Sequence, residues 1–171
     1  VASNSLYGGT YNLLANTLPR FGITTTFVDP DVAENFTNAV ASNTRAFFAE
    51  SLGNPKLDVL DLKAIADTAK AAKVPFIVDN TVASPALLNP IAHGANIVIH
   101  SLTKYLTGNG TSLGGIIIDA GTFDWANGNF PEFTEPNPSY HGLNYHEALG
   151  AIAFIAKVRI EGLRDLGSAP S

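Results

Sequence analysis

The sequence contains no cysteine and no methionine, and charged residues make up only 15% of its 171 residues. The absence of cysteine excludes disulfide bonds, thiolate metal sites and a cysteine nucleophile. Acidic residues outnumber basic ones by 15 to 10, and no run of basic residues occurs. The net charge of −5 argues against partners such as nucleic acids or anionic membranes. The four histidines lack the spacing of known metal motifs, so no metal site is predicted.

Long apolar runs are also missing, because no stretch approaches the length of a membrane-spanning helix. No signal-peptide pattern is visible, and we therefore expect a cytoplasmic protein. Hydrophobic residues still make up 46% of the chain, which is enough for one domain with a substantial core. Because the charged share is well below the usual value of about a quarter, we expect further chain or a partner subunit to cover part of the surface.

Short apolar runs alternate with segments of helical periodicity along the chain. The apolar, β-branched runs predict strands at 23–29, 44–51, 75–81, 95–101 and 114–121, the last three of them buried. The helical periodicity predicts helices at 7–22, 33–42, 62–73, 85–92 and 144–167. Because most strand runs are continuously apolar, the predicted fold class is α/β, with a mostly parallel sheet covered by helices on both faces.

Polar residues collect at the predicted carboxyl ends of three of these strands. They are Glu50, Ser51, Asp79, Asn80, Ser101, Thr103 and Lys104. Ligands of parallel α/β sheets bind beyond the carboxyl ends of the strands. The sequence therefore predicts a functional site at this edge of the sheet.

Lys104 follows one of these strands, and the hydroxyls of Ser101 and Thr103 come just before it. A lysine in a mostly desolvated site loses part of its preference for the charged form, so its amine can form a Schiff base. Hydroxyls and the backbone N–H groups of nearby glycines can hold a phosphate. A buried Asp79 can keep a heteroaromatic nitrogen protonated. Pyridoxal phosphate requires this set of groups.

Each of these features also has a simpler interpretation. A lone lysine after a strand is usually solvated, and Asp79 with Asn80 suits a turn or a helix cap. Tyr7, before two glycines, is commonly a core aromatic. The segment 108–115 partly resembles a nucleotide-binding loop but lacks the strand–loop–helix context of such loops. The order of the motifs together is more informative than any one of them.

Four stretches occur in an order that closely resembles the Cys/Met-metabolism family of pyridoxal-phosphate enzymes. They are YGGTYNL at 7–13, ESLGNPKLDVLDL at 50–62, FIVDNTVASP at 76–85 and HSLTKYLTGNG at 100–110. The resemblance covers essentially the whole chain. Within the family, the stretches at 108–125 and 130–145 look like the O-acetylhomoserine sulfhydrylase branch.

The resemblance implies the cofactor domain of a fold-type I, aspartate aminotransferase-like enzyme and two catalytic residues. Lys104 would form a Schiff base with pyridoxal 5'-phosphate and later carry protons between substrate carbons. Tyr7 would stack on the cofactor ring and assist proton transfer.

Four further positions would bind the cofactor. Asp79 would pair with the pyridinium nitrogen, and Asn54 would donate a hydrogen bond to the phenolate oxygen of the ring. Ser101 and Thr103 would hold the phosphate. The resemblance gives supporting roles to Glu50, Ser51, Asn80 and Thr81.

The reaction implied is a γ-replacement, in which sulfide or a thiol replaces the acetate of O-acetyl-L-homoserine to give homocysteine or methionine. A cystathionine γ-synthase or a methionine or cystathionine γ-lyase remains an alternative within the same chemistry. A catalytically silent scaffold of the same fold and a nucleotide-binding α/β domain remain alternatives from other classes.

The resemblance also implies that residues 1–171 are a partial cofactor-binding domain. The family's upstream phosphate-binding loop and Tyr-x-Arg element would precede Val1, and its arginine for the substrate carboxylate would follow Ser171. We therefore expect the isolated chain to be inactive. We expect the full-length protein to be a homo-oligomer, a tetramer built from close dimers with shared active sites.

Overall fold

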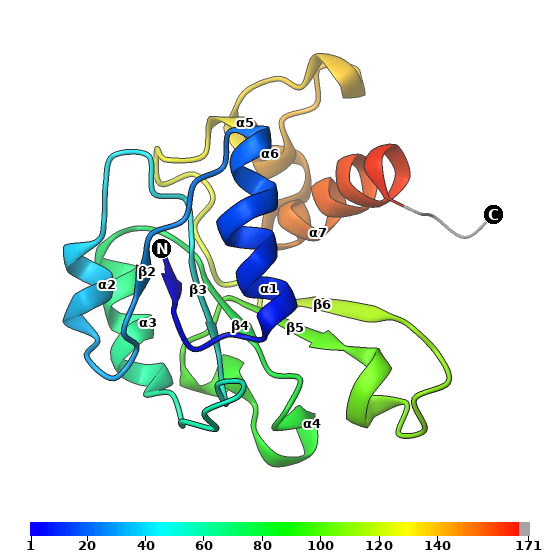
Figure 1. Ribbon diagram of the computed structural model, residues 1–171. Coiled ribbons are helices and arrows are strands. Elements are labelled where there is room, and N and C mark those ends of the chain that lie inside the picture. The colour runs from blue at the N-terminus through cyan, green and yellow to red at the C-terminus, as the bar shows by residue number, and fades with distance from the viewer. Residues whose placement is uncertain (168–171) are drawn as a thin grey trace. The chain divides into compact units, whose positions relative to one another are not determined.

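The computed structural model describes residues 1–167 and divides into two compact units (Figure 1). The first unit runs from Val1 to Ile118, and the second begins at Asp119. The last four positions of the predicted domain, 168–171, lie outside the described residues. No helix among those described is both long enough and apolar enough to cross a membrane.

A six-stranded sheet with the strand order β2-β1-β3-β4-β5-β6 forms the framework of the first unit (Figure 1). The strands are β1 (Ala2–Ser3), β2 (Phe27–Val28), β3 (Phe47–Glu50), β4 (Phe76–Asp79), β5 (Ile97–Ser101) and β6 (Gly115–Asp119). The pairs β1–β2, β1–β3, β3–β4 and β4–β5 are all parallel. The predicted α/β class with a mostly parallel sheet is confirmed.

The helix α3 (Leu62–Ala71) shows why the apolar pattern specifies this packing. The Asp61 side chain accepts a hydrogen bond from the Ala64 N–H at 3.0 Å and so caps the first turn. The apolar residues that recur at helical spacing along α3 are all buried, namely Leu62, Ile65, Ala66 and Ala69. They pack with Phe36, Phe47 and Phe76 in one hydrophobic core, and each large side chain contributes about 1.5–3 kcal/mol by its burial.

The helix predicted at 7–22 is continuous in the structure, although its winding changes along its length. It begins as α1 (Gly8–Asn12), continues as a π-helical turn over Leu13–Thr17 and ends as a 3-10 turn over Leu18–Phe21. Gly22, at φ 80°, ends it because a left-handed residue cannot continue a right-handed helix. The remaining helices of this unit are α2 (Glu34–Asn38), α4 (Ser84–Leu87), a 3-10 turn over Pro90–His93 and a π-helical turn over Leu102–Leu106.

Two strand predictions need correction. The strand predicted at 23–29 is reduced to the two residues of β2, since only its end pairs with β1. The strand β6 was expected to be buried, but Ile116 and Ile117 are 42% and 44% exposed. β6 is the last strand in the order, and successive side chains point to opposite faces of a sheet, so the described residues leave both faces of β6 partly uncovered here.

The second unit contains short helices around an aromatic cluster. They are α5 (Pro131–Thr134), a 3-10 turn (Pro138–Tyr140), α6 (Tyr145–Leu149), a 3-10 turn (Gly150–Ile152), α7 (Ala153–Lys157) and a π-helical segment (Val158–Leu166). Trp125 is buried and stacks on Phe133 and Phe154. The single helix predicted at 144–167 is wrong, because Gly150 takes φ 52° and ψ −123° and so breaks the helical path.

Candidate functional site

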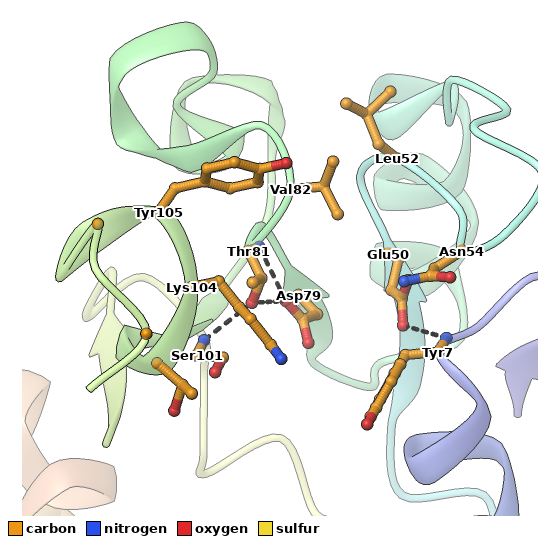
Figure 2. A pocket seen from close by; sticks show the side chains of 13 residues that line it. Tyr7, Glu50, Leu52, Asn54, Asp79, Thr81, Val82, Ser101, Lys104 and Tyr105 are labelled. Carbon is orange, nitrogen blue, oxygen red and sulfur yellow. Dashed lines mark hydrogen bonds between the residues drawn. The ribbon is translucent and has the colours of Figure 1, made fainter. Parts of the chain in front are cut away.

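The six residues to which the resemblance assigns catalytic or cofactor-binding roles all line one cavity of about 530 Å³ in the first unit (Figure 2). They are Tyr7, Asn54, Asp79, Ser101, Thr103 and Lys104. The wall also includes Glu50, Leu52, Thr81, Val82, Tyr105, Gly108 and Gly110. The structure thus brings these six residues together, while their individual roles stay predictions. Ser51 and Asn80, also expected at this edge, do not line the cavity, because both are buried and hydrogen-bonded to each other.

The sheet register explains how residues so far apart in sequence meet. Glu50 at the end of β3 is paired with Asp79 at the end of β4, and Asp79 is paired with Ile99 of β5. Because these strands are parallel, their carboxyl ends lie at one edge of the sheet. Lys104 follows β5 at that edge, and Tyr7 lies between β1 and α1.

Thr81 fixes the orientation of the Asp79 carboxylate. Both the backbone N–H and the hydroxyl of Thr81 donate to Asp79 Oδ1, at 2.9 and 2.6 Å. Thr81 Oγ1 in turn accepts the Ser101 N–H at 2.8 Å, which links β4 to β5 (Figure 2). One carboxylate oxygen is therefore held, and Oδ2 forms no hydrogen bond within the described part of the chain. The sequence motif contains Thr81, but only the fold reveals this link.

Lys104 lies where the backbone leaves regular geometry. Its φ of −97° and ψ of −122° are not helical, although it falls inside the helical turn Leu102–Leu106. Figure 2 shows its amino group projecting into the cavity that Asp79 and Tyr7 also line. The lysine is exposed, so the desolvation expected from the sequence is not provided by the described residues. The free ammonium group can reach a ligand without first breaking an ion pair within this part of the chain.

The two predicted phosphate-binding hydroxyls differ in their surroundings. Thr103 Oγ1 accepts the Gly114 N–H at 3.2 Å and donates to the Gly114 carbonyl at 3.4 Å. The second bond is long, so the Thr103 proton is weakly held and can turn toward an anion. Ser101 lines the same cavity (Figure 2). Gly108 and Gly110, at φ 77° and 69°, line it without side chains that would obstruct the backbone.

Glu50 is a buried carboxylate in the cavity wall, only 7% exposed. Its Oε1 accepts the backbone N–H of Tyr7 at 2.7 Å (Figure 2). Burial raises the pKa of Glu50 to about 7, the backbone N–H groups of Tyr7 and Asn54 oppose this rise, and the charge of Asp79 adds to it. The carboxyl therefore changes its protonation state near neutral pH.

Three apolar wall residues were not anticipated from the sequence. Figure 2 shows Leu52, Val82 and the Tyr105 ring at the side of the cavity away from Tyr7. Tyr105 directly follows Lys104, which is a signal that could have been used. Nothing in the sequence distinguishes Leu52 and Val82 from ordinary core residues.

Taken together, the cavity offers an amine, carboxylates, aromatic rings, hydroxyls and the backbone of two glycines. This donor set suits a flat heteroaromatic molecule with a carbonyl carbon, a ring nitrogen that must stay protonated and a phosphate. The residues present therefore fit pyridoxal phosphate.

Comparison with known proteins leads to the same chemistry. The family model described as Cys/Met metabolism PLP-dependent enzyme matches residues 1–164. The chain is 59% identical to the O-acetyl-L-homoserine sulfhydrylase of Leptospira meyeri, over all of this chain and 40% of that protein. The chain therefore spans about two fifths of the length of this curated relative.

Solved structures of two kinds are similar to the chain. A Campylobacter jejuni protein assigned as an O-acetylhomoserine (thiol)-lyase, which carries a pyridoxyl-lysine monophosphate, superposes with a TM-score of 0.93 at 42% identity, over 98% of this chain and 42% of that one. The cystathionine γ-lyase of Lactobacillus plantarum superposes with a TM-score of 0.67 at 37% identity, over 69% of this chain and 31% of that one.

Proposed function

Because the chain belongs to the family of Cys/Met metabolism PLP-dependent enzymes, we propose that its protein replaces the acetate of O-acetyl-L-homoserine with sulfide or a thiol. The products are homocysteine or methionine, and acetate. The observation that carries the proposal is the cavity that Lys104 shares with Asp79 and Tyr7, where Lys104 has no ion pair among residues 1–167.

The cofactor, pyridoxal 5'-phosphate, is held by residues from four segments of the first unit. The free Oδ2 of Asp79 accepts the N–H of the ring nitrogen and keeps it protonated, because Thr81 fixes the other oxygen. The Tyr7 ring stacks on the cofactor ring, and the Asn54 amide donates to its phenolate oxygen. The hydroxyls of Ser101 and Thr103 donate to the phosphate.

Lys104 and Tyr7 move the protons of the reaction. The bound cofactor withdraws electrons from the amino acid attached to it, which makes the hydrogens on Cα and then Cβ acidic. Lys104 Nζ binds the aldehyde carbon until the substrate amine displaces it, and then takes up and returns these protons. The Tyr7 hydroxyl assists these transfers.

Atoms balance over the whole exchange. The bond between Cγ and the acetate oxygen breaks, and a bond from sulfur to Cγ forms. Hydrogen sulfide supplies the sulfur and one hydrogen as a proton, which leaves with the acetate. No electrons are gained or lost, so no oxidant or reductant is needed.

A cystathionine γ-synthase or a γ-lyase is the second candidate function. Its support is the similarity to the cystathionine γ-lyase, although that similarity extends over only 69% of this chain. Two assays separate the candidates. Sulfide-dependent formation of homocysteine from O-acetylhomoserine indicates the first candidate, and release of 2-oxobutyrate from methionine indicates a lyase. Faster 2-oxobutyrate release would replace the first candidate with the second.

The setting of the enzyme is part of the same proposal. We place it in the cytoplasm as a homotetramer, a dimer of dimers. The exposed Ile116 and Ile117 and the low charge content support covered surfaces in the complete protein. Mass measurement of the full-length protein under native conditions tests the tetramer.

The decisive test of the cofactor is borohydride reduction of the full-length protein, followed by peptide mapping. We expect a pyridoxyl phosphate adduct on Lys104 and none in Lys104→Ala. A folded protein that is supplied with the cofactor and forms no adduct would overturn the proposal and favour a catalytically silent scaffold. An adduct on another lysine would overturn the assignment of Lys104.

A further inference from the structure

We infer that Glu50 is a positioning residue whose carboxylate holds the Tyr7 and Asn54 segments in the arrangement that binds the cofactor. This inference rests on the proposed function, because Tyr7 and Asn54 are the residues assigned to the cofactor ring. It gives a specific task to a side chain that does not itself need to touch the reacting atoms.

Glu50 lies at the point where the two segments meet. Tyr7 is the residue before α1, and its N–H donates to Glu50 Oε1 at 2.7 Å although 43 positions separate them. The backbone N–H of Asn54 also faces the Glu50 carboxylate and, like that of Tyr7, acts to lower its pKa. The N–H groups at the start of a helix lack partners within the helix, so a carboxylate there satisfies one and stabilises the helix dipole.

A second hydrogen bond also links the same two segments. Ser5 Oγ donates to Asp58 Oδ1 at 2.7 Å. Gly53 lies so close to both that a Cβ there would collide with Ser5 Oγ and Asp58 Oδ1. Because this second tie does not involve Glu50, replacing Glu50 loosens the position of Tyr7 without separating the segments.

The charges around Glu50 make its hold sensitive to pH. Asp79 on β4 and Asp58 in the loop before α3 both face it, and Lys104 projects into the same cavity from beyond β5. The pKa of Glu50 lies at about 7, mainly because of burial. An ionised carboxylate accepts hydrogen bonds more strongly than a protonated one, so the hold on Tyr7 and Asn54 weakens as Glu50 takes up a proton.

The test measures pyridoxal phosphate binding to the full-length apoprotein by absorbance titration, below and above pH 7. Glu50→Ala removes the acceptor, and Glu50→Gln mimics the protonated carboxyl. Glu34→Gln is the matched control, because Glu34 is exposed on α2. Above pH 7 we expect Glu50→Ala to weaken binding by about tenfold, the scale of one hydrogen bond to a charged group. We expect Glu50→Gln to weaken cofactor binding less than Glu50→Ala does. The wild type and Glu34→Gln should both bind more weakly as the pH falls below 7, and Glu50→Gln should lack this pH dependence.

A second measurement follows the contact itself. Hydrogen exchange of the Tyr7 amide in the apoprotein should be faster in Glu50→Ala than in Glu34→Gln, with exchange in α3 unchanged. Wild-type cofactor binding in both Glu50 variants, or an unaltered pH profile in Glu50→Gln, would overturn the inference and leave the proposed function intact. A wild type that binds no pyridoxal phosphate would overturn the proposed function, and the inference with it.

Discussion

Each of the two units holds a lysine among carboxylates, and the two lysines are used differently. Lys157 in the second unit donates to both oxygens of Glu161 at 2.7 Å and lies over the rings of Phe133 and Tyr145. Lys104 in the first unit has no ion pair within the described chain. The comparison teaches that a lysine with satisfied partners stabilises a fold, whereas one left unpaired in a cavity is available for chemistry.

The carboxylates of the two regions follow the same rule. Glu161 also accepts hydrogen bonds from Asn137 at 2.8 Å and from the Tyr145 hydroxyl at 3.3 Å. Glu50 faces Asp79 and Asp58, and its pKa rises to about 7. Glu161 is therefore surrounded by hydrogen-bond donors and a cation, whereas Glu50 is buried beside other carboxylates and changes its charge near neutral pH.

Replacing each lysine in turn is the strongest test of whether Lys104 and Lys157 serve different purposes. Lys104→Ala should lower kcat/KM by at least about a thousandfold, because it removes the group that moves protons, with the melting temperature nearly unchanged. Lys157→Ala should lower the melting temperature and leave the turnover of the folded enzyme within a few-fold. Steady-state kinetics and calorimetry on both variants check this, and equal losses of activity would contradict the distinction.

Glu50 should make the stability of the apoprotein depend on pH. Its pKa rises from 4.5 in the unfolded chain to about 7 in the fold. Between these pH values the folded state binds more protons than the unfolded state. The contribution of Glu50 to the free energy of unfolding is therefore fully present below pH 4.5 and is lost as the pH rises through 7. The resulting change in the free energy of unfolding amounts to roughly 3 kcal/mol at most.

Glu50→Gln, which cannot ionise, should therefore melt at a higher temperature than the wild type above pH 7, and at a similar temperature below pH 4.5. Thermal unfolding followed by circular dichroism across this range measures the effect. Parallel curves for the two proteins would show that burial does not raise the pKa of Glu50.

The salt bridge of the second unit should contribute less. Lys157 and Glu161 have side chains that are 18% and 37% exposed, and Lys157→Met keeps the apolar stem while removing the charge. We expect Lys157→Met to lower the free energy of unfolding by about 1–2 kcal/mol. Lys63→Met is the matched control, because its bridge to Asp67 is 69% and 61% exposed and should cost about 0.5 kcal/mol or less. Equal shifts in melting temperature would mean that the two bridges are equivalent.

The smallest expected effect concerns Thr81, which orients Asp79. Thr81→Val removes the donor to Asp79 Oδ1 and the acceptor for the Ser101 N–H. We expect kcat/KM to fall about fivefold, which corresponds to about 1 kcal/mol. Thr81→Ser keeps the hydroxyl and should restore most of the rate, so a serine variant as slow as the valine variant would exclude this role.

The regular parts of the fold were predictable because their signals are local. The inward face of α3 follows from the spacing of Leu62, Ile65 and Ala69, and the cap at Asp61 follows from its place before them. The helix predicted at 144–167 failed for a reason that is also local. Glycine is tolerated within a helical pattern, so the sequence did not reveal that Gly150 takes a left-handed conformation.

The residues that form the site were predictable from the sequence, whereas their exposure and charge were not. The motifs around Tyr7, Asp79 and Lys104 identified residues that the fold does bring into one cavity. The exposure of Lys104 and the burial of Glu50 depend on what the remaining chain places around them. Such surroundings have no signature in a short stretch of sequence.

By itself, the sequence determined the α/β class, the apolar face of α3 and the set of polar residues at the strand ends, since periodicity and motif order are properties of neighbouring residues. The contact between Glu50 and Tyr7 across 43 positions and the link from Asp79 through Thr81 to Ser101 exist only in the folded chain. The fold also pairs Lys157 with Glu161 and leaves Lys104 without an ion pair among the described residues. Charge, burial and hydrogen bonding at a site are set by groups that are distant in the chain and become neighbours only when the sheet register is in place.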